Sequence, residues 1–212
     1  MIRVQLARAR RVAVVTAAAL VVAGCSGGAA AQSDPGYVTG PGVVTRTPVE
    51  ERVALPRVTG ALLQGGEFDS AEYPDTVLVY NVWGSWCAPC RAEAPALQEV
   101  WEQTRDRGVQ FVGVNVKDSD AAARAFEREF GITYPSITTA DYGAVLLAFR
   151  ASLPPSAIPS TLVVDRDGRV AARIVGATTY TKLRRLVARC SPSRPENLPG
   201  SRAGACAPQA AG

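Results

Sequence analysis

Cys87 and Cys90, which have two residues between them, are the residues of this chain whose type and spacing best suit a chemical reaction. A C-x-x-C pair can close a short disulfide ring and so exchange two electrons with other thiols. Half of a zinc site is one alternative, but Cys190 and Cys206 do not stand at ligand spacing and the chain has no histidine. An inert structural disulfide is the other alternative. We therefore expect a redox pair, no metal and no cofactor.

The segments on either side of the pair are those that such chemistry needs. Residues 76–83 are almost continuously apolar and rich in β-branched side chains, as expected of a strand covered on both faces. A helix is expected to follow Cys87 and to end at Gly108, so that Cys87 lies where unpaired backbone N–H groups favour a thiolate. Trp86 is expected to shield the pair while leaving the Cys87 sulfur exposed, with Cys90 buried one turn further on.

The chain beyond this helix alternates strands and helices. Periodicity, turn residues and capping residues predict a strand at 109–116, a helix capped by Asp118 or Ser119, a short helix at 143–150, a hairpin of strands at 160–164 and 170–175, and a last helix at 179–189. This order predicts an α/β fold with a mixed central β-sheet flanked by helices on both faces.

The first 24 residues have the pattern of a secretory signal. Four arginines precede an apolar run at 12–23, which is too short to span a bilayer comfortably. The run leads to Cys25, as in the bacterial lipoprotein box, where the cysteine bears lipid; an ordinary cleavage site is the alternative. We expect an exported protein that lipid on Cys25 anchors to the outer face of the cell membrane. Without this leader the basic and acidic residues balance, so nucleic acid is not an expected partner.

Composition predicts how the rest of the chain is organised. Residues 25–55 are interpreted as a flexible tether, 56–190 as the folded domain, and 191–212, rich in Pro, Ser, Gly and Ala, as a disordered tail. We expect Cys190 and Cys206 to form a structural disulfide that takes no part in turnover. The rival hypothesis is that Cys190 relays electrons to the redox pair.

Two motifs together carry a resemblance to a known family. The first is Asn81-Val-Trp-Gly-Ser-Trp-Cys-Ala-Pro-Cys-Arg-Ala-Glu-Ala-Pro95, and the second, far downstream, is Ala157-Ile-Pro-Ser-Thr-Leu-Val-Val-Asp-Arg-Asp-Gly168. They resemble the ResA/TlpA family of extracytoplasmic thiol–disulfide oxidoreductases, including the CcsX-type lipoproteins of actinobacteria. The resemblance covers residues 55–189 and implies a thioredoxin fold.

The same resemblance implies roles for individual residues. Cys87 would be the attacking thiolate and Cys90 the resolving thiol. Pro159 would be a cis-proline that faces the pair, so that the backbone of Ile158 can bind an extended substrate like an added strand. Trp86 would belong to the same substrate-binding surface.

Glu93 completes the implied set. It lies one helical turn after Cys90 and would accept or return the proton of that thiol, the alternative being a first-turn glutamate that the helix dipole favours. Cytoplasmic thioredoxins carry a buried Asp where this chain has Asn81, and since a neutral amide cannot act as a base, that role would move to Glu93 or to water. Ala88 stands where some ResA-like proteins have an acid, which should make the Cys87 thiolate easier to form.

The resemblance leads to one functional hypothesis and two alternatives. The hypothesis is a lipid-anchored reductase that reduces the haem-site disulfide of an apocytochrome c and is re-reduced by a membrane thiol carrier of the CcdA type. The first alternative is an exported dithiol oxidant, although a strong one would carry a histidine between the cysteines. The second is a non-enzymatic binding lipoprotein. A peroxiredoxin-type peroxidase and a Sco-type copper carrier lack their motifs here.

Overall fold

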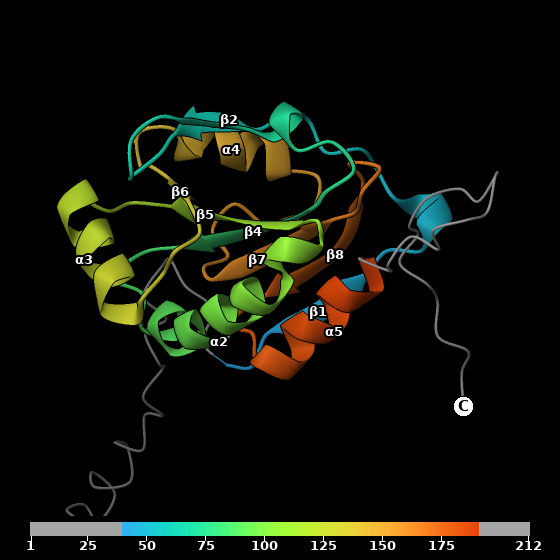
Figure 1. Ribbon diagram of the computed structural model, residues 1–212. Helices are drawn as coiled ribbons and strands as arrows, with labels where there is room; N and C mark the ends of the chain where they lie inside the picture. Colours follow the sequence, from blue (N-terminus) through green and yellow to red (C-terminus); the bar gives the residue numbers. More distant parts are fainter. Residues whose placement is uncertain (1–39, 191–212) are drawn as a thin grey trace, which may run out of the picture. The chain divides into compact units, whose positions relative to one another are not determined.

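The computed structural model describes residues 40–190, and a six-stranded mixed sheet forms their centre (Figure 1). The strands are β1 (Val43–Arg46), β4 (Val77–Trp83), β5 (Val109–Asn115), β6 (Ser136–Ile137), β7 (Ser160–Val164) and β8 (Val170–Val175), in the spatial order β1-β8-β7-β4-β5-β6. β4 pairs parallel with β5 and antiparallel with β7. The sheet is therefore mixed, as the order of the predicted elements indicates.

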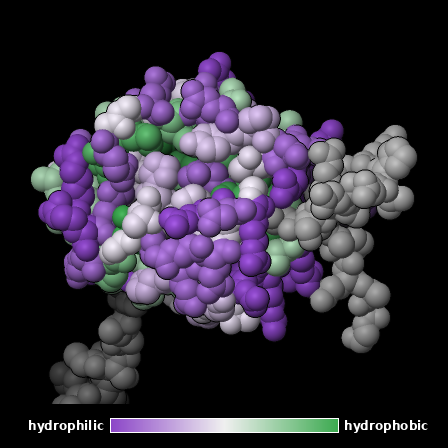
Figure 2. Space-filling model, in the orientation of Figure 1, coloured by the Kyte–Doolittle hydropathy of each residue, from purple (hydrophilic) through white to green (hydrophobic). Residues whose placement is uncertain are grey.

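Helices cover both faces of the sheet. They are α2 (Ala88–Thr104), α3 (Asp120–Phe130), α4 (Tyr142–Phe149) and α5 (Tyr180–Cys190), with three 3-10 turns, η1 (Val49–Glu51), η2 (Ser70–Glu72) and η3 (Arg105–Arg107). Figure 1 shows α2 and α5 side by side on one face and α4 on the other, under the hairpin of β2 (Thr59–Ala61) and β3 (Glu67–Asp69). Mainly hydrophilic side chains cover the outward faces of α2 and α5 (Figure 2).

β4 is buried along its whole length because its side chains alternate between two hydrophobic clusters. Leu78, Tyr80 and Val82 belong to one cluster, while Val77 and Val79 belong to the other. Each such side chain, fully removed from water, contributes about 1.5–3 kcal/mol. The first cluster also contains both redox cysteines, so the strand that leads to them is fixed by packing on two sides.

The domain begins earlier than composition predicts. β1, at residues 43–46 of the expected tether, pairs antiparallel with β8 at the edge of the sheet. Most of its side chains are exposed, so composition gives little sign of the strand. Further on, Arg52 forms a 2.9 Å ion pair with Asp165, and each side chain is only 2% exposed. The boundary placed at residue 56 is therefore too late.

Some expectations concern parts of the chain outside residues 40–190. The expected signal peptide, Cys25, Cys206 and the expected tail all lie outside the described residues. Within the described range, no helix is long and apolar enough to cross a membrane.

Candidate active site

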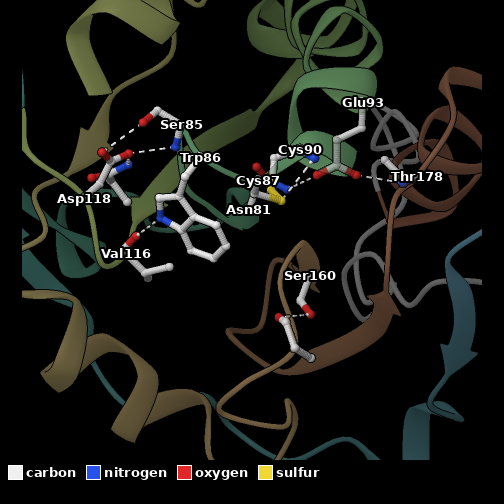
Figure 3. Close-up of a disulfide and its surroundings, with 12 residues drawn as sticks. Asn81, Ser85, Trp86, Cys87, Cys90, Glu93, Val116, Asp118, Ser160 and Thr178 are labelled. Carbon is white, nitrogen blue, oxygen red and sulfur yellow. Dashed lines mark hydrogen bonds between the residues drawn. A yellow bond between two sulfur atoms is a disulfide. The ribbon is translucent and has the colours of Figure 1, made fainter. Parts of the chain in front are cut away.

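The redox pair lies at the start of α2. β4 ends at Trp83, a short turn follows, and Cys87 is the N-cap residue of the helix. Cys87 and Cys90 form a disulfide across the first turn, with their Cα atoms 5.3 Å apart (Figure 3). The N–H of Cys90 donates to the Cys87 Sγ at 3.2 Å. In the reduced protein the same donor, with the other first-turn amides, favours a thiolate on Cys87.

The expected exposure of the Cys87 sulfur is not observed in this disulfide form. Cys87 is 0% exposed and Cys90 is 2% exposed, because both pack into the first hydrophobic cluster. Trp86, directly before the pair, is 42% exposed, and its indole Nε1 donates to the carbonyl of Val116 at 3.3 Å. Burial therefore does not distinguish the two cysteines, and their difference rests on the position of Cys87 at the helix terminus.

Glu93 is buried beside the disulfide (Figure 3), and it lies beyond the first turn of α2, which holds no acidic residue, so the alternative of a first-turn glutamate does not fit. Burial raises the pKa of Glu93 to about 7, while hydrogen bonds from the backbone of Thr178 and the side chain of Asn81 keep it from rising further. The Thr178 N–H donates to Oε2 at 2.7 Å and the Asn81 Nδ2 donates to Oε1 at 2.8 Å. A carboxyl with a pKa near neutral can both take up and return a proton at physiological pH.

Asn81 has a more specific place than the sequence indicates. Besides Glu93, its Nδ2 contacts the Thr161 Oγ1 at 3.3 Å, so the amide links β4, α2 and β7. An aspartate here would place two carboxyl groups against each other in a buried site. The amide instead supplies a donor that favours the ionised form of Glu93.

Pro159 lies at the same end of the central strands as the redox pair. Ser160 stands opposite Val82 in the register of β7 and β4, so the preceding proline lies near the end of β4. The Ile158–Pro159 peptide bond is cis, as the resemblance implies. Ile158 packs in the same cluster as the two cysteines, and no other described residue hydrogen-bonds to its backbone.

The turn before Cys87 is tied to the turn after β5. Asp118 accepts hydrogen bonds from the backbone N–H of Ser85 at 2.7 Å and from its Oγ at 2.9 Å (Figure 3). Sequence reasoning offered Asp118 as one of two possible helix caps. The cap of α3 is Ser119, whose Oγ accepts from the Ala122 N–H, so Asp118 is free to bind the turn that leads to the disulfide.

Cys190 lies apart from this site. It is buried at the end of α5 in the second hydrophobic cluster, whereas the redox pair belongs to the first. It is disulfide-bonded, and its expected pairing with Cys206 stays a prediction. Among residues 40–190, no group of three or more His, Cys, Asp or Glu side chains could hold a metal ion.

The structure combines a C-x-x-C disulfide at the start of a helix, directly after a central strand of a mixed sheet, with a cis-proline near the end of the same strand. These features define a thiol–disulfide oxidoreductase of thioredoxin-like fold. Comparison with known proteins places the chain more narrowly. Residues 50–187 match the Redoxin family, and the chain belongs to that family. A thiol–disulfide oxidoreductase is an enzyme, so the alternative of a non-enzymatic binding lipoprotein is excluded.

The relatives confirm the ResA-type resemblance. The chain is 25% identical over 130 residues to the thiol-disulfide oxidoreductase ResA of Bacillus thuringiensis (61% of this chain, 72% of the relative) and 31% identical over 103 residues to ResA of Bacillus subtilis (49% and 55%). Among solved structures, a DsbF homologue from Corynebacterium diphtheriae is 33% identical with a TM-score of 0.61 (68% of this chain, 90% of that one). A secreted thiol-disulfide isomerase from Corynebacterium glutamicum is 30% identical, also with a TM-score of 0.61 (70% and 89%).

Proposed function

We propose that this protein is an exported, membrane-tethered reductase of protein disulfides whose client is the haem-site disulfide of an apocytochrome c. The observation that carries the proposal is the buried Glu93 one helical turn from Cys90, with a pKa of about 7. It supplies the proton acceptor that the resolving thiol needs at neutral pH. The similarity to the thiol-disulfide oxidoreductase ResA supports a disulfide-containing protein as the substrate.

The chemistry follows from the positions of these groups. The Cys87 thiolate attacks one sulfur of the client disulfide, a mixed disulfide forms, and the second client sulfur leaves as a thiolate that takes up a proton. Glu93 then takes the proton of Cys90, and the Cys90 thiolate attacks the Cys87 sulfur. The client leaves as a dithiol, and the protein retains the disulfide seen in the structure. Two electrons pass to the client, and a membrane thiol carrier of the CcdA type would restore them.

Client binding is assigned to the backbone of Ile158 and to the indole of Trp86. The backbone groups of Ile158 receive no hydrogen bond from the described residues, and the cis-Pro159 follows directly. An extended client segment can pair with this backbone as an added strand. The indole of Trp86 is the exposed apolar surface next to the disulfide that such a segment would cover.

The proposed location is the outer face of the cell membrane, with residues 1–24 removed and lipid on Cys25. Similar proteins from Corynebacterium glutamicum and Mycobacterium tuberculosis are described as secreted. Cys25→Ser is expected to move the protein from the membrane fraction to the soluble fraction. A mature N-terminus elsewhere, without lipid in the mass spectrum, would contradict the anchor.

The direction of electron flow is tested by the redox state of Cys87 and Cys90 in the cell. Acid quenching followed by alkylation should find the pair mostly reduced if the protein is a reductase. An exported dithiol oxidant is the second candidate, which the absence of an acid at position 88 favours. A pair found mostly oxidised would support that candidate and overturn the reductase.

A further inference from the structure

The carboxylate of Asp118 accepts four hydrogen bonds, although Asp118 is not the cap of α3. Its Oδ2 accepts from the Ser85 N–H at 2.7 Å and from the Asn115 Nδ2 at 3.1 Å. Its Oδ1 accepts from the Ser85 Oγ and from the Ser119 N–H, both at 2.9 Å. Its own N–H donates to the Thr139 Oγ1 at 3.3 Å. The carboxylate therefore joins the turn after β4 to the turn after β5.

The sheet brings these two turns together. Trp83 and Asn115, the last residues of β4 and β5, stand opposite each other in the parallel register, so the segments that follow them leave the sheet side by side. Two further hydrogen bonds join the segments, from the Val116 N–H to the Trp83 carbonyl at 2.9 Å and from the Trp86 indole to the Val116 carbonyl. One of these two bonds reaches the last residue of β4 and the other comes from the residue directly before Cys87.

Both turns have backbones that leave little freedom. Lys117, directly before Asp118, has φ of +50°, a conformation that non-glycine residues rarely adopt. On the other side, a Cβ on Gly84 would come within 2.6 Å of the Trp86 Nε1, so this position requires glycine for the indole to lie where it does. Asp118 and the Trp86 indole are the side chains that hydrogen-bond from one turn to the other, and Asp118 makes two of these bonds.

We propose that Asp118 is a positioning residue for the redox centre, holding the Gly84–Trp86 turn so that Cys87 begins α2 with its sulfur directed at the first-turn amides. The Cys87 N–H donates to the Gly84 carbonyl at 3.1 Å, and the Cys87 Sγ accepts from the Cys90 N–H. A shift of Ser85 moves Gly84 and so displaces the sulfur from that donor. The inference rests on the assignment of Cys87 as the attacking thiol.

The donor pattern requires a carboxylate in particular. Each oxygen of Asp118 faces one backbone N–H, from Ser85 on Oδ2 and from Ser119 on Oδ1. In Asp118→Asn, either orientation of the amide directs an NH₂ group at a backbone donor, so one backbone bond is lost whichever way it turns. The isosteric variant should therefore release the turn almost as fully as a truncation would.

The experiment compares Asp118→Asn with Asp120→Asn in the full chain. Asp120 lies two residues further on, its side chain is 45% exposed, and among the described residues it pairs only with Arg124, at 3.4 Å. Asp120→Asn therefore removes the same charge as Asp118→Asn but leaves the hydrogen bonds of Asp118 in place. The readouts are the alkylation rate of Cys87 in the reduced protein and the equilibrium constant of the redox pair with glutathione. For Asp118→Asn we expect alkylation at pH 7 about tenfold slower, within the ~100-fold that a 1 Å misplacement can cost. The equilibrium should shift toward the protein disulfide.

The outcomes separate three roles for Asp118. A purely electrostatic role predicts the opposite sign, because removing a negative charge makes a nearby thiolate easier to form, and faster alkylation in both variants would overturn the proposal. A merely structural role predicts a lower melting temperature with an unchanged rate and glutathione equilibrium, which would also overturn it. Asp120→Asn should keep the wild-type rate or exceed it slightly.

A second variant and a mapping step keep the test decisive. If Asp118→Asn does not fold, Ser85→Ala removes only the hydroxyl donor and should slow alkylation in the same direction by a smaller factor; a wild-type rate would overturn the proposal. Peptide mapping identifies the labelled thiol. Label on Cys90 first would contradict the assignment of Cys87 and the proposed mechanism with it. Label on Cys87 at an unchanged rate would contradict only the role of Asp118.

Discussion

Replacing Asn81 by leucine should change the pH at which Glu93 works. Burial raises the pKa of Glu93 to about 7, and the Asn81 amide is one of two donors that oppose this rise. A buried hydrogen bond to a charged group contributes about 1.5–3 kcal/mol, and one pKa unit corresponds to about 1.4 kcal/mol. Asn81→Leu should therefore raise the pKa of Glu93 by about 1–2 units.

The step to measure is the attack of Cys90 on a mixed disulfide at Cys87. An aromatic disulfide reagent releases one coloured thiolate when Cys87 attacks it and a second when Cys90 resolves the adduct, so the second phase of the stopped-flow absorbance follows this step. In the wild type about half of Glu93 is ionised at pH 7, and in Asn81→Leu about 1–10% would be. We expect resolution about 5–50-fold slower at pH 7, with the rate recovering as the pH rises toward 9.

Two controls make the result interpretable. Thr161→Val removes the other hydrogen-bond partner of the Asn81 amide, at 3.3 Å, and leaves the bond to Glu93, so its pH profile should match the wild type. Glu93→Gln should flatten the profile in this range. An inflection at the same pH in Asn81→Leu and in the wild type would refute the argument that Asn81 sets the proton affinity of Glu93.

Three further predictions follow from the same site and its surroundings. Cys90→Ser should trap a mixed disulfide through Cys87 on non-reducing gels, whereas Cys87→Ser should abolish exchange; trapping in the second variant would reverse the roles. In the wild type, the free energy of unfolding should fall as the pH rises from about 4.5 to about 7, because the unfolded Glu93 ionises at 4.5 while burial keeps the folded group protonated up to about 7. Urea denaturation across this range should show Glu93→Gln more stable at pH 8 by up to about 3 kcal/mol, and equal stability would contradict the buried charge. Cys190→Ala with Cys206→Ala should leave exchange rates unchanged, and a large loss of turnover at intact stability would make Cys190 part of the mechanism.

Local patterns were sufficient to predict the elements that carry the redox pair. The apolar run at 76–83 forms β4, and the helix that follows Cys87 ends before Gly108, which adopts the left-handed conformation that terminates η3. The hairpin strands at 160–164 and 170–175 have the predicted bounds. These features depend on side-chain periodicity and turn residues, which are properties of short segments.

The surroundings of the site depend on contacts between distant segments, and the sequence alone does not reveal them. Glu93 is held by Asn81, twelve residues away, and by Thr178, 85 residues away. The Thr178 bond comes from a backbone N–H, which every residue but proline possesses, so no side chain marks it. The burial of Cys87 likewise depends on how the domain packs around it.

The pairing of β1 determines where the preceding chain joins the domain. Val43 stands opposite Val175 and the Gly42 N–H donates to the Ala177 carbonyl, while Val175 stands opposite Ser160. The chain therefore joins the domain at the end of the strands where Pro159 and the redox pair lie. If lipid on Cys25 holds the protein, about 17 residues separate the anchor from this edge, a contour length of at most about 60 Å. Clients that are themselves held at the membrane then lie within reach of the reactive disulfide.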